Sequence, residues 1–462
     1  MNKRMISLMA AALALLSASG QVTFTGVGEN DVIKETPPSN TDLNMIYVLY
    51  DINGVKMTFN STTGERAKWE TFYYRDGNLV MEPVTDVRWD GMATTLDRII
   101  PNIGYKIQEG DNRPYYCWVV NYADYPFELR GMTVNYDTPC DPISFSIDGS
   151  GDEIPYFDLR GGRHVLDREI KLSYKTKVWD DSDRDDEHNH KWIDAPVDTT
   201  FKSLNELLST RIDPPLCDTE FYISGDAFLR NWGKPEKETY ADFQTRAVKC
   251  HVTAILDDGE EGIDISNGVE DTEGLSAPAH VHFTGYPVGD VGNCVWEIST
   301  DPNFEDESAI DRYYQEEFDY TFDVGGATYY VRFTVYNRDE SCQDSYDIPL
   351  FRVSESYMPD QKMMPNFFSP GDNTEANNIW KVKTRSLVEF HCWIYNRWGN
   401  LVYEYTDPDG GWDGYYNGKL VDTGVYYYVI TATGIDGTKY KRRGDINILR
   451  YKRGGVGGTS DM

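Results

Sequence analysis

IYNRWGNLVYE, residues 394–404, places alternating apolar and polar residues on both sides of an Arg-Trp-Gly corner. Upstream of the corner, Val388, Phe390 and Cys392 continue the alternation and share one face with Ile394. A period of two is the pattern of a strand with one buried face and one wet face. We therefore predict short strands joined by a tight turn, with Cys392 as a small buried hydrophobe and not a reactive thiol.

Strand-like segments of the same kind continue on both sides of this stretch. They include PNFFSP, which begins at Pro365, and the long run GGWDGYYNGKLVDTGVYYYVITATG, which begins at Gly410. The pattern predicts about six or seven short strands separated by Gly turns. We expect a self-contained small β-sandwich over residues 363–452, followed by a flexible tail at 453–462.

The order and spacing of these motifs resemble the gliding motility-associated C-terminal domain, which is the type B sorting domain of the type IX secretion system of Bacteroidetes. The family motifs P-N-x-F-S-P, Y-N-R-W-G, W-D-G and G-V-Y-Y are matched by Pro365, Asn366, Phe368, Ser369, Pro370, Tyr395, Asn396, Arg397, Trp398, Gly399, Trp412, Asp413, Gly414, Gly424, Val425, Tyr426 and Tyr427. The sequence departs from the family in the shortened loop GDNTEANN and in the terminal extension YKRGGVGGTSDM.

This resemblance implies that the folded domain is recognised as the signal for translocation of the protein across the outer membrane. The implied partners are the type IX secretion machinery and an outer-membrane β-barrel partner protein, and the implied destination is the cell surface or the extracellular space. The exposed candidates for recognition are the corner at 397–399 and the turn at 412–414. The alternative is that Trp398 and Trp412 fill the core of a small domain, and the sequence leaves both alternatives open.

Composition and charge bound the rest of the chain. A chain of 462 residues is too long for a single hydrophobic core, which predicts several domains of about 100 to 150 residues. The 33 Tyr, 11 Trp and 39 Gly residues favour β-structure. The net charge of −32 argues against nucleic acid or an anionic membrane as a partner, because like charges repel.

The first residues, MNKRMISLMAAALALLSASGQ, have the pattern of a secretory signal peptide. Lys3 and Arg4 precede a short apolar run, and Ala18 and Gly20 are the small residues expected before cleavage at Gln21. No later stretch approaches the roughly 20 apolar residues that span a bilayer. We therefore predict a protein that passes through the periplasm and does not span a membrane.

Between the two ends, strands with alternating apolar residues predict tandem β-sandwiches. Trp69 is expected in the first core. The pair Gly104-Tyr105 resembles the corner of an immunoglobulin-like domain, although Ile107 stands where many such domains have Cys. The run FKSLNELLSTRI, residues 201–212, is the only helix expected in the second sandwich.

A later segment resembles a polycystic-kidney-disease-type (PKD) fold through Trp296, Ile298 and residues 330–335. The predicted class is therefore all-β, with immunoglobulin-like and PKD-like sandwiches ahead of a small C-terminal sandwich. The predicted boundaries are a signal peptide at 1–20, a flexible lead-in at 21–43, an immunoglobulin-like sandwich at 44–137, a second sandwich at 138–256, an acidic linker at 257–274, a PKD-like domain at 275–358, the sorting domain at 363–452 and a flexible tail at 453–462.

Seven cysteines in an exported chain make disulfide bonds plausible. The partners expected by domain are Cys117 with Cys140, Cys217 with Cys250, and Cys294 with Cys342, and Cys392 is left over. The spacing alone does not fix this connectivity.

One acidic stretch of the sequence has the residue types of a metal site. WDDSDRDDEHNHKW, residues 179–192, gathers carboxylates around His188 and His190. It lacks the Gly hinge and the distal Glu of a Ca²⁺ loop, which favours a solvated loop, with calcium as the alternative. No G-x-S-x-G, H-E-x-x-H or phosphate-loop motif occurs. We therefore predict no catalytic residue, no cofactor and no metal.

Together these patterns favour a non-enzymatic adhesin or structural surface component. The alternative is a secreted hydrolase or glycan-binding protein that acts on extracellular polymers, with its site between residues 142 and 256. Trp179, Trp192 and Trp232 are then the candidates for sugar-stacking platforms. In either case the expected ligand is an extracellular glycan or protein.

Overall fold

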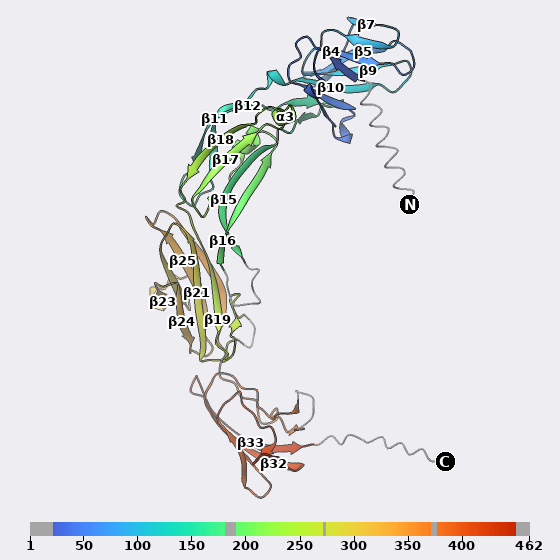
Figure 1. The fold of residues 1–462 in the computed structure, drawn as a ribbon. Coiled ribbons are helices and arrows are strands. Elements are labelled where there is room, and N and C mark those ends of the chain that lie inside the picture. The colour runs from blue at the N-terminus through green and yellow to red at the C-terminus, as the bar shows by residue number, and fades with distance from the viewer. Residues whose placement is uncertain (1–21, 181–190, 271–273, 371–376, 450–462) are drawn as a thin grey trace, which may run out of the picture. The chain divides into compact units, whose positions relative to one another are not determined.

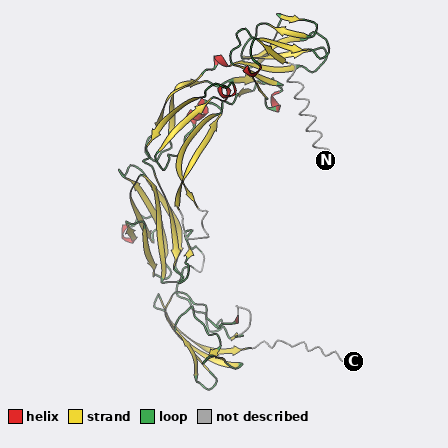
Figure 2. Cartoon of the chain, viewed as in Figure 1, coloured by secondary structure: helices red, strands yellow, loops and turns green. Residues whose placement is uncertain are grey.

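Strands make up nearly all the regular structure of the computed structural model, which describes residues 22–180, 191–270, 274–370 and 377–449 (Figure 1). This confirms the predicted all-β class (Figure 2). The signal peptide, the carboxylate-rich loop at 181–190 and the tail at 453–462 lie outside the described residues. The helices are short: η1 (Glu29–Asp31), η2 (Ser39–Thr41), η3 (Tyr122–Asp124), α2 (Leu204–Ser209), α3 (Ala227–Asn231) and η4 (Glu307–Ala309).

Contacts divide the chain into two units, residues 1–180 with 193–245 and residues 181–192 with 246–462. Unit 1 begins with two sheets. One has the order β1 (Val22–Thr25), β4 (Lys56–Asn60), β8 (Ala93–Leu96) and β7 (Val87–Trp89). The other has the order β2 (Val32–Glu35), β3 (Met45–Leu49), β10 (Tyr115–Asn121), β9 (Ile103–Gln108), β5 (Lys68–Arg75) and β6 (Asn78–Pro83).

The predicted lead-in at 21–43 is wrong, because β1 and β2 are strands of these sheets. Val22 pairs with Phe59 and is buried, and Ile33 pairs with Val48 and is buried as well. A segment that is polar and Pro-rich overall still carries enough apolar residues to close two sheets. The average composition of residues 21–43 therefore did not reveal the apolar residues that β1 and β2 contribute to the sheets.

The core of the first sandwich confirms the two aromatic predictions. Trp69 is buried, and its indole N–H donates to Thr94 Oγ1 at 2.9 Å. The Tyr105 hydroxyl donates to the Ile100 carbonyl at 3.0 Å and accepts from the Ile100 N–H at 2.7 Å. A buried Tyr that bonds the backbone a few residues upstream is the corner of immunoglobulin-like sandwiches.

A buried carboxylate fixes the loop that follows β4. Glu109 accepts hydrogen bonds from the backbone of Thr62 at 2.9 Å and of Thr63 at 3.2 Å, and from the Thr62 hydroxyl at 2.7 Å. Its other partners are the Ser61 hydroxyl and the Asn112 side-chain amide, which donates at 3.5 Å. Burial acts to raise the pKa of Glu109, but the hydrogen bonds outweigh it and lower the pKa to about 2.

This depressed pKa predicts an acid-labile loop. The stabilisation is fully present above the ordinary Glu pKa of about 4.5 and is lost as the pH falls through the folded pKa of about 2. Glu109→Gln should lower the free energy of unfolding at neutral pH by about 2 kcal/mol and flatten its dependence on pH between about 5 and 2. Urea unfolding of both proteins across that range tests this, with the exposed Glu65→Gln as the control. An unchanged pH dependence in Glu109→Gln would contradict it.

The second part of unit 1 is a further set of strands. Its pairs and sheets are β11 (Phe127–Asn135) with β12 (Ser144–Gly151), β13 (Pro155–Phe157) with β14 (Arg163–Val165), and a sheet in the order β16 (Lys191–Phe201), β15 (Ile170–Asp180), β17 (Thr219–Gly225) and β18 (Lys237–Phe243). β11 pairs with β12, so the predicted boundary at 137 cuts through a strand pair. α2 lies inside the predicted helical run, where Ser203 Oγ caps it by accepting from the Glu206 N–H. The sequence did not predict α3.

The most deeply buried charges of unit 1 belong to Arg168 and Asp226, which form an ion pair with both side chains fully buried. Asp226 also accepts from the Tyr122 hydroxyl at 3.2 Å and from the Phe228 N–H at 2.7 Å. Arg168 donates to the Tyr125 carbonyl at 2.6 Å. Because Tyr122 and Tyr125 follow β10 of the first sandwich, the pair joins the first and second parts of unit 1.

This pair predicts an asymmetric response to mutation. Asp226→Ala should destabilise unit 1 by about 3 to 5 kcal/mol, because it leaves a buried guanidinium without a counter-charge. The control is Asp148→Ala, which removes the exposed pair Arg130–Asp148 and should cost under about 1 kcal/mol. Chemical denaturation measures both. Equal effects of the two substitutions would contradict the prediction.

Unit 2 begins with a sandwich of two four-stranded sheets. One has the order β20 (Ile263–Asp264), β19 (Val248–Leu256), β21 (Ala279–Gly289) and β24 (Glu317–Phe322), and the other the order β23 (Ile310–Tyr313), β22 (Val291–Ser299), β25 (Thr328–Asn337) and β26 (Gln343–Arg352). Trp296 is fully buried, with its ring centroid 4.5 Å from that of Phe333 and 5.5 Å from that of Phe283. Trp296 and Ile298 are both buried, and their strand β22 pairs antiparallel in one sheet with β25, which holds residues 330–335, so these two strands do not face each other across the sandwich.

Two boundaries around this sandwich are corrected. β19 pairs with β21 along its whole length, so it does not belong to the second sandwich, where residues 248–256 were expected. The predicted linker at 257–274 contains β20 and also bridges the sandwich through Val269, which pairs with Phe351. Ile265 in this segment is buried. A few apolar side chains thus anchor a segment whose acidic composition indicated an extended linker.

The C-terminal part of unit 2 is a five-stranded sheet with a small hairpin. The sheet order is β27 (Phe367–Phe368), β33 (Lys439–Ile448), β32 (Gly424–Gly434), β28 (Leu387–Tyr395) and β29 (Leu401–Tyr405), and the hairpin joins β30 (Tyr415–Tyr416) to β31 (Lys419–Leu420). Cys392 is fully buried, as predicted. Val388 is half exposed, against prediction, because a bulge between Leu387 and Glu389 turns it outward.

The predicted disulfide pairs do not form. The cysteines with free thiols are Cys117, Cys217, Cys250, Cys294 and Cys392. Cys117 lies mid-strand in the first core, where burial raises its pKa, and Cys250 Sγ lies 3.7 Å from the Phe333 carbonyl oxygen. Cys140 and Cys342 are disulfide-bonded. Pairing by domain failed because two of the chosen partners are core residues.

Candidate functional site

Three of the four motifs predicted in the C-terminal part meet around Trp412, which is fully buried. The Phe368 ring of the first motif lies 5.4 Å from the Trp412 ring between centroids. The Tyr426 ring of the last motif lies 5.2 Å away. The Trp412 indole N–H donates to the Tyr415 carbonyl at 3.2 Å. P-N-x-F-S-P, W-D-G and G-V-Y-Y are therefore parts of one aromatic core.

Trp380, which sequence reasoning did not single out, completes this core. Its backbone N–H donates to the Trp412 carbonyl at 2.8 Å, and the Trp412 N–H donates back at 2.9 Å. The Trp380 indole N–H donates to the Pro365 carbonyl at 2.8 Å. The available clue was the large aromatic residue in the short run NNIWKVKT.

The smaller motif residues make turns and close contacts. Gly414 has a φ of +78° and lies so close to Pro370 that a Cβ would approach the proline ring to 2.7 Å. Asp413 accepts from the Tyr415 N–H at 2.9 Å, and the Ser369 N–H donates to the Asn377 carbonyl at 2.8 Å. These contacts hold the chain around Trp412.

The remaining motif residues lie at the edges. Asn366 accepts through its carbonyl from the Asn447 N–H at 2.8 Å. Gly424 and Val425 begin β32 and are exposed, and Tyr427 on the same strand is exposed as well. These positions leave part of the motif set free to contact another molecule.

The fourth motif forms a projecting corner between β28 and β29. Asn396 Oδ1 accepts from the N–H groups of Trp398 and Asn400, both at 3.0 Å, which is the side-chain bond of an Asx turn. Gly399 has a φ of +82°, which glycine adopts without strain. The Arg397 guanidinium lies 4.2 Å from the Trp398 ring centroid, and Trp398 is 71% exposed. The corner thus presents a cation stacked on an indole.

The sequence left open whether Trp398 and Trp412 belong to a recognition surface or to the core, and the structure gives a different answer for each. Trp412 fills the core, and Trp398 is a surface residue. The two side chains have equal size and opposite environments, so they make a matched pair for mutation.

We expect Trp412→Ala to destabilise this part of the chain by about 3 to 5 kcal/mol, because it removes a buried indole and leaves a cavity. Trp398→Ala should change its stability by less than about 1 kcal/mol, which is the scale of an exposed cation–π contact. Thermal melting followed by tryptophan fluorescence separates the two variants. A comparable loss in both would contradict the assignment of Trp398 to the surface.

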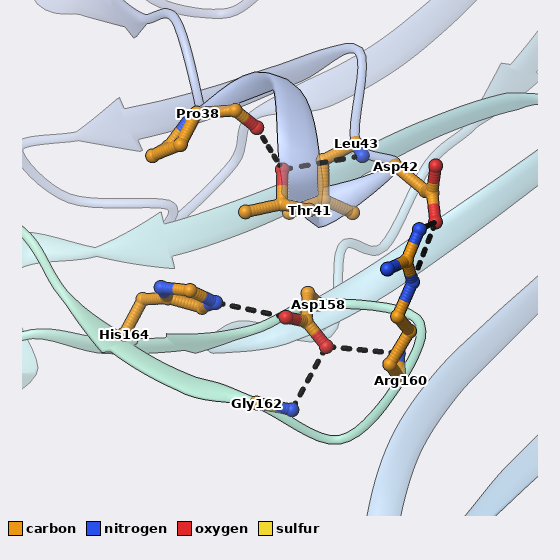
Figure 3. Close-up of polar contacts among 8 residues, drawn as sticks. All are labelled: Pro38, Thr41, Asp42, Leu43, Asp158, Arg160, Gly162 and His164. Atoms are coloured by element: carbon orange, nitrogen blue, oxygen red, sulfur yellow. Dashed lines mark hydrogen bonds and ion pairs between the residues drawn. The ribbon is translucent and has the colours of Figure 1, made fainter.

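A second polar cluster lies in unit 1, at the hairpin of β13 and β14 (Figure 3). Asp158 accepts from the N–H groups of Arg160 and Gly162, both at 2.8 Å, and lies 2.9 Å from His164 Nε2. Burial acts to raise the pKa of Asp158, but the bond from His164 and the two backbone bonds outweigh it and hold the pKa low. Arg160 reaches across to Asp42 at 3.0 Å (Figure 3).

This cluster was not predicted, and its contacts are those of a turn anchor. The His164 ring stacks on Tyr156 with 5.0 Å between centroids. His164 Nε2 thus faces the carboxylate that holds the turn. Asp158 fixes the hairpin, and Arg160 fastens it to η2 next to Asp42.

The three tryptophans proposed as sugar platforms are all partly buried. The Trp232 ring packs against Tyr122 at 5.0 Å and Tyr50 at 5.3 Å, and its indole N–H donates to the Asp31 carbonyl at 3.0 Å. Trp179 and Trp192 are partly buried. Over the described residues, no group of three or more His, Cys, Asp or Glu side chains is placed to hold a metal ion. The described helices include none long and apolar enough to cross a membrane.

Residues 362–448 match the family described as the CHU_C type IX secretion signal domain. The C-terminal domain is a type IX secretion signal domain. The recognition made from the motifs is thereby confirmed, and this signal domain directs export to the cell surface or the extracellular space and implies contact with the secretion machinery. Residues 133–240, ahead of it, match a fibronectin type III domain, Fn3_FA.

Solved structures with tandem repeats are also similar to the chain. A tetra-tandem repeat from the extending region of a large adhesion protein is 12% identical, covers 87% of this chain and 97% of its own, and has a TM-score of 0.22. The FN1–FN3 domains of chicken CNTN1 are 11% identical, cover 71% of this chain and 100% of their own, and have a TM-score of 0.24. No curated protein matches the chain.

Proposed function

We propose that the chain is a non-enzymatic surface protein, either an adhesin or a structural surface component, which type IX secretion delivers with the help of an outer-membrane β-barrel partner protein. The observation that carries this proposal is the series of β-sandwiches ahead of the signal domain. Sandwich modules bury their aromatic residues in cores, as Trp69 and Trp296 do here, and leave loops and sheet faces for binding.

Charge supports a role outside the cell. The net charge of −32 keeps such a molecule soluble and repels it from anionic surfaces, so lasting contacts need a specific ligand or bound cations. An extracellular glycan or protein is the ligand class that fits a displayed series of sandwiches. The His164–Asp158 pair serves the hairpin and adds no support for hydrolysis.

The test uses the purified chain from residue 21 on a panel of extracellular glycans and proteins. We expect saturable binding to at least one member of the panel, with no product formed on prolonged incubation. Release of reducing ends or peptides would overturn the non-enzymatic assignment. His164→Gln serves as the diagnostic variant, because a turnover that it abolishes would assign hydrolysis to the β13–β14 hairpin.

A further inference from the structure

Within unit 2, Ser386 connects the signal domain to the sandwich that precedes it. Ser386 comes directly before β28 and is fully buried. The Ala277 N–H donates to Ser386 Oγ at 3.0 Å, and the Ser386 hydroxyl donates to the Ser354 carbonyl at 2.9 Å. The Ser386 N–H donates to Ser276 Oγ at 2.8 Å. Three hydrogen bonds of one signal-domain residue therefore reach the sandwich.

The segments that share these bonds with Ser386 are held in place by the sandwich itself. One segment leads into β21, and the other follows β26. The Leu275 N–H donates to the Arg352 carbonyl at 2.8 Å, and the Ser354 N–H donates to the Leu275 carbonyl at 2.8 Å. Leu275 and Val353 are both buried. Ser386 is therefore bonded to backbone that belongs to the folded sandwich.

The backbone of Ser386 has a conformation that serine rarely adopts. Its φ is +50°, which lies in the left-handed region. The Ser386 carbonyl accepts from the Ile435 N–H, in the turn between β32 and β33, at 2.9 Å. A residue keeps such a conformation when the surrounding structure specifies it from several sides. For Ser386 these sides are the signal domain and the sandwich.

The covalent connection between the two domains is short and bonded at both ends. The Ser356 hydroxyl donates to the Asp436 carboxylate at 2.7 Å, and the Tyr440 hydroxyl donates to the Ser356 carbonyl at 2.9 Å. Ser354 is bonded to the sandwich and Ser356 to the signal domain, so a single residue, Glu355, separates the two sets of bonds. One residue is too short to act as a flexible linker.

The core of the signal domain extends into this connection. Met358 is 3% exposed and belongs to the buried cluster of that domain, although the match to the signal-domain family begins at residue 362. The Tyr357 N–H donates to the Arg385 carbonyl at 3.0 Å, and the Arg385 N–H donates to the Tyr357 carbonyl at 3.1 Å. Gly325 of the sandwich lies so close to Ile435 that a Cβ would approach the isoleucine side chain to 2.8 Å. The two domains thus meet through packing as well as hydrogen bonds.

We propose that Ser386 locks the signal domain to the sandwich before it, so that the two domains unfold together as one cooperative body. Domains joined by an exposed linker usually behave independently. Here, separation would break the hydrogen bonds of a fully buried serine and the packing around it. The secretion signal is thereby stabilised by a domain that lies outside its own motifs. This inference goes beyond the proposed function, and its test does not use export or binding.

Urea unfolding of the chain from residue 21, followed by pulsed hydrogen exchange and mass spectrometry, measures each domain separately. Peptides from β25 report the sandwich, and peptides from β32 report the signal domain. In the natural chain we expect both sets to lose protection at one urea midpoint. Ser386→Ala removes the hydroxyl that joins the domains and should separate the midpoints by about 0.5 M or more.

Ser299→Ala is the matched control for the loss of a buried hydroxyl. Ser299 is 1% exposed, and its Oγ accepts from the Asp301 N–H at 2.9 Å inside the sandwich. This substitution should lower the common midpoint without splitting it. Splitting by Ser299→Ala as large as that by Ser386→Ala would overturn the role of Ser386.

A core substitution in the sandwich tests the coupling without a change at Ser386. Ile298 is 1% exposed, so Ile298→Val removes a buried methyl group and destabilises the sandwich. In the natural chain it should lower the β32 midpoint as much as the β25 midpoint, and in the Ser386→Ala chain it should lower the β25 midpoint alone. If Ser386→Ala does not fold, the measurement in the natural chain decides. A β32 midpoint that Ile298→Val leaves unchanged in the natural chain, or midpoints that stay together in Ser386→Ala, would overturn the lock.

Discussion

The buried ion pair of Arg168 and Asp226 is the constraint around which unit 1 is arranged. Two ions without access to water are stable only when hydrogen bonds and dipoles around them compensate for the lost hydration. Tyr122 and Phe228 donate to the carboxylate, and Tyr125 accepts from the guanidinium. Because these partners come from the end of the first sandwich and from α3, the charges specify how the two parts of the unit join. Burial raises the pKa of Asp226, and the Arg168 cation opposes that rise.

The alternation of apolar and polar residues predicted the features of the fold that depend on local sequence. The strands, the core positions of Trp69 and Trp296, and the Tyr105 corner all follow from alternation and turn residues, and the structure contains them. The signal domain was predicted from its motifs, because its core uses the same aromatic residues that define them. In these cases the residues that identify the element are also the residues that hold it together.

The predictions that failed concern residues whose partners lie far away in the sequence. The Arg168–Asp226 pair joins residues 58 positions apart, and neither residue stands out in its own segment. β19 looks like any alternating strand, and only its pairing with β21 assigns it to the later sandwich. The cysteines were paired by neighbourhood, whereas Cys117 is fixed in a core by its strand. In the candidate site, Trp380 was missed for the same reason, since its backbone partner, Trp412, lies in a later segment.

The position of β33 in the signal domain determines when its sheet can be completed. β33 lies between β32 and β27, and it joins Phe367 and Phe368 to the sheet through Asn447 and Ile448. The first motif of the signal domain is therefore held in the sheet by the last strand of that domain. A polypeptide that ends before β33 could therefore not close this sheet around its first motif, so the complete sheet forms only after the whole domain has been synthesised.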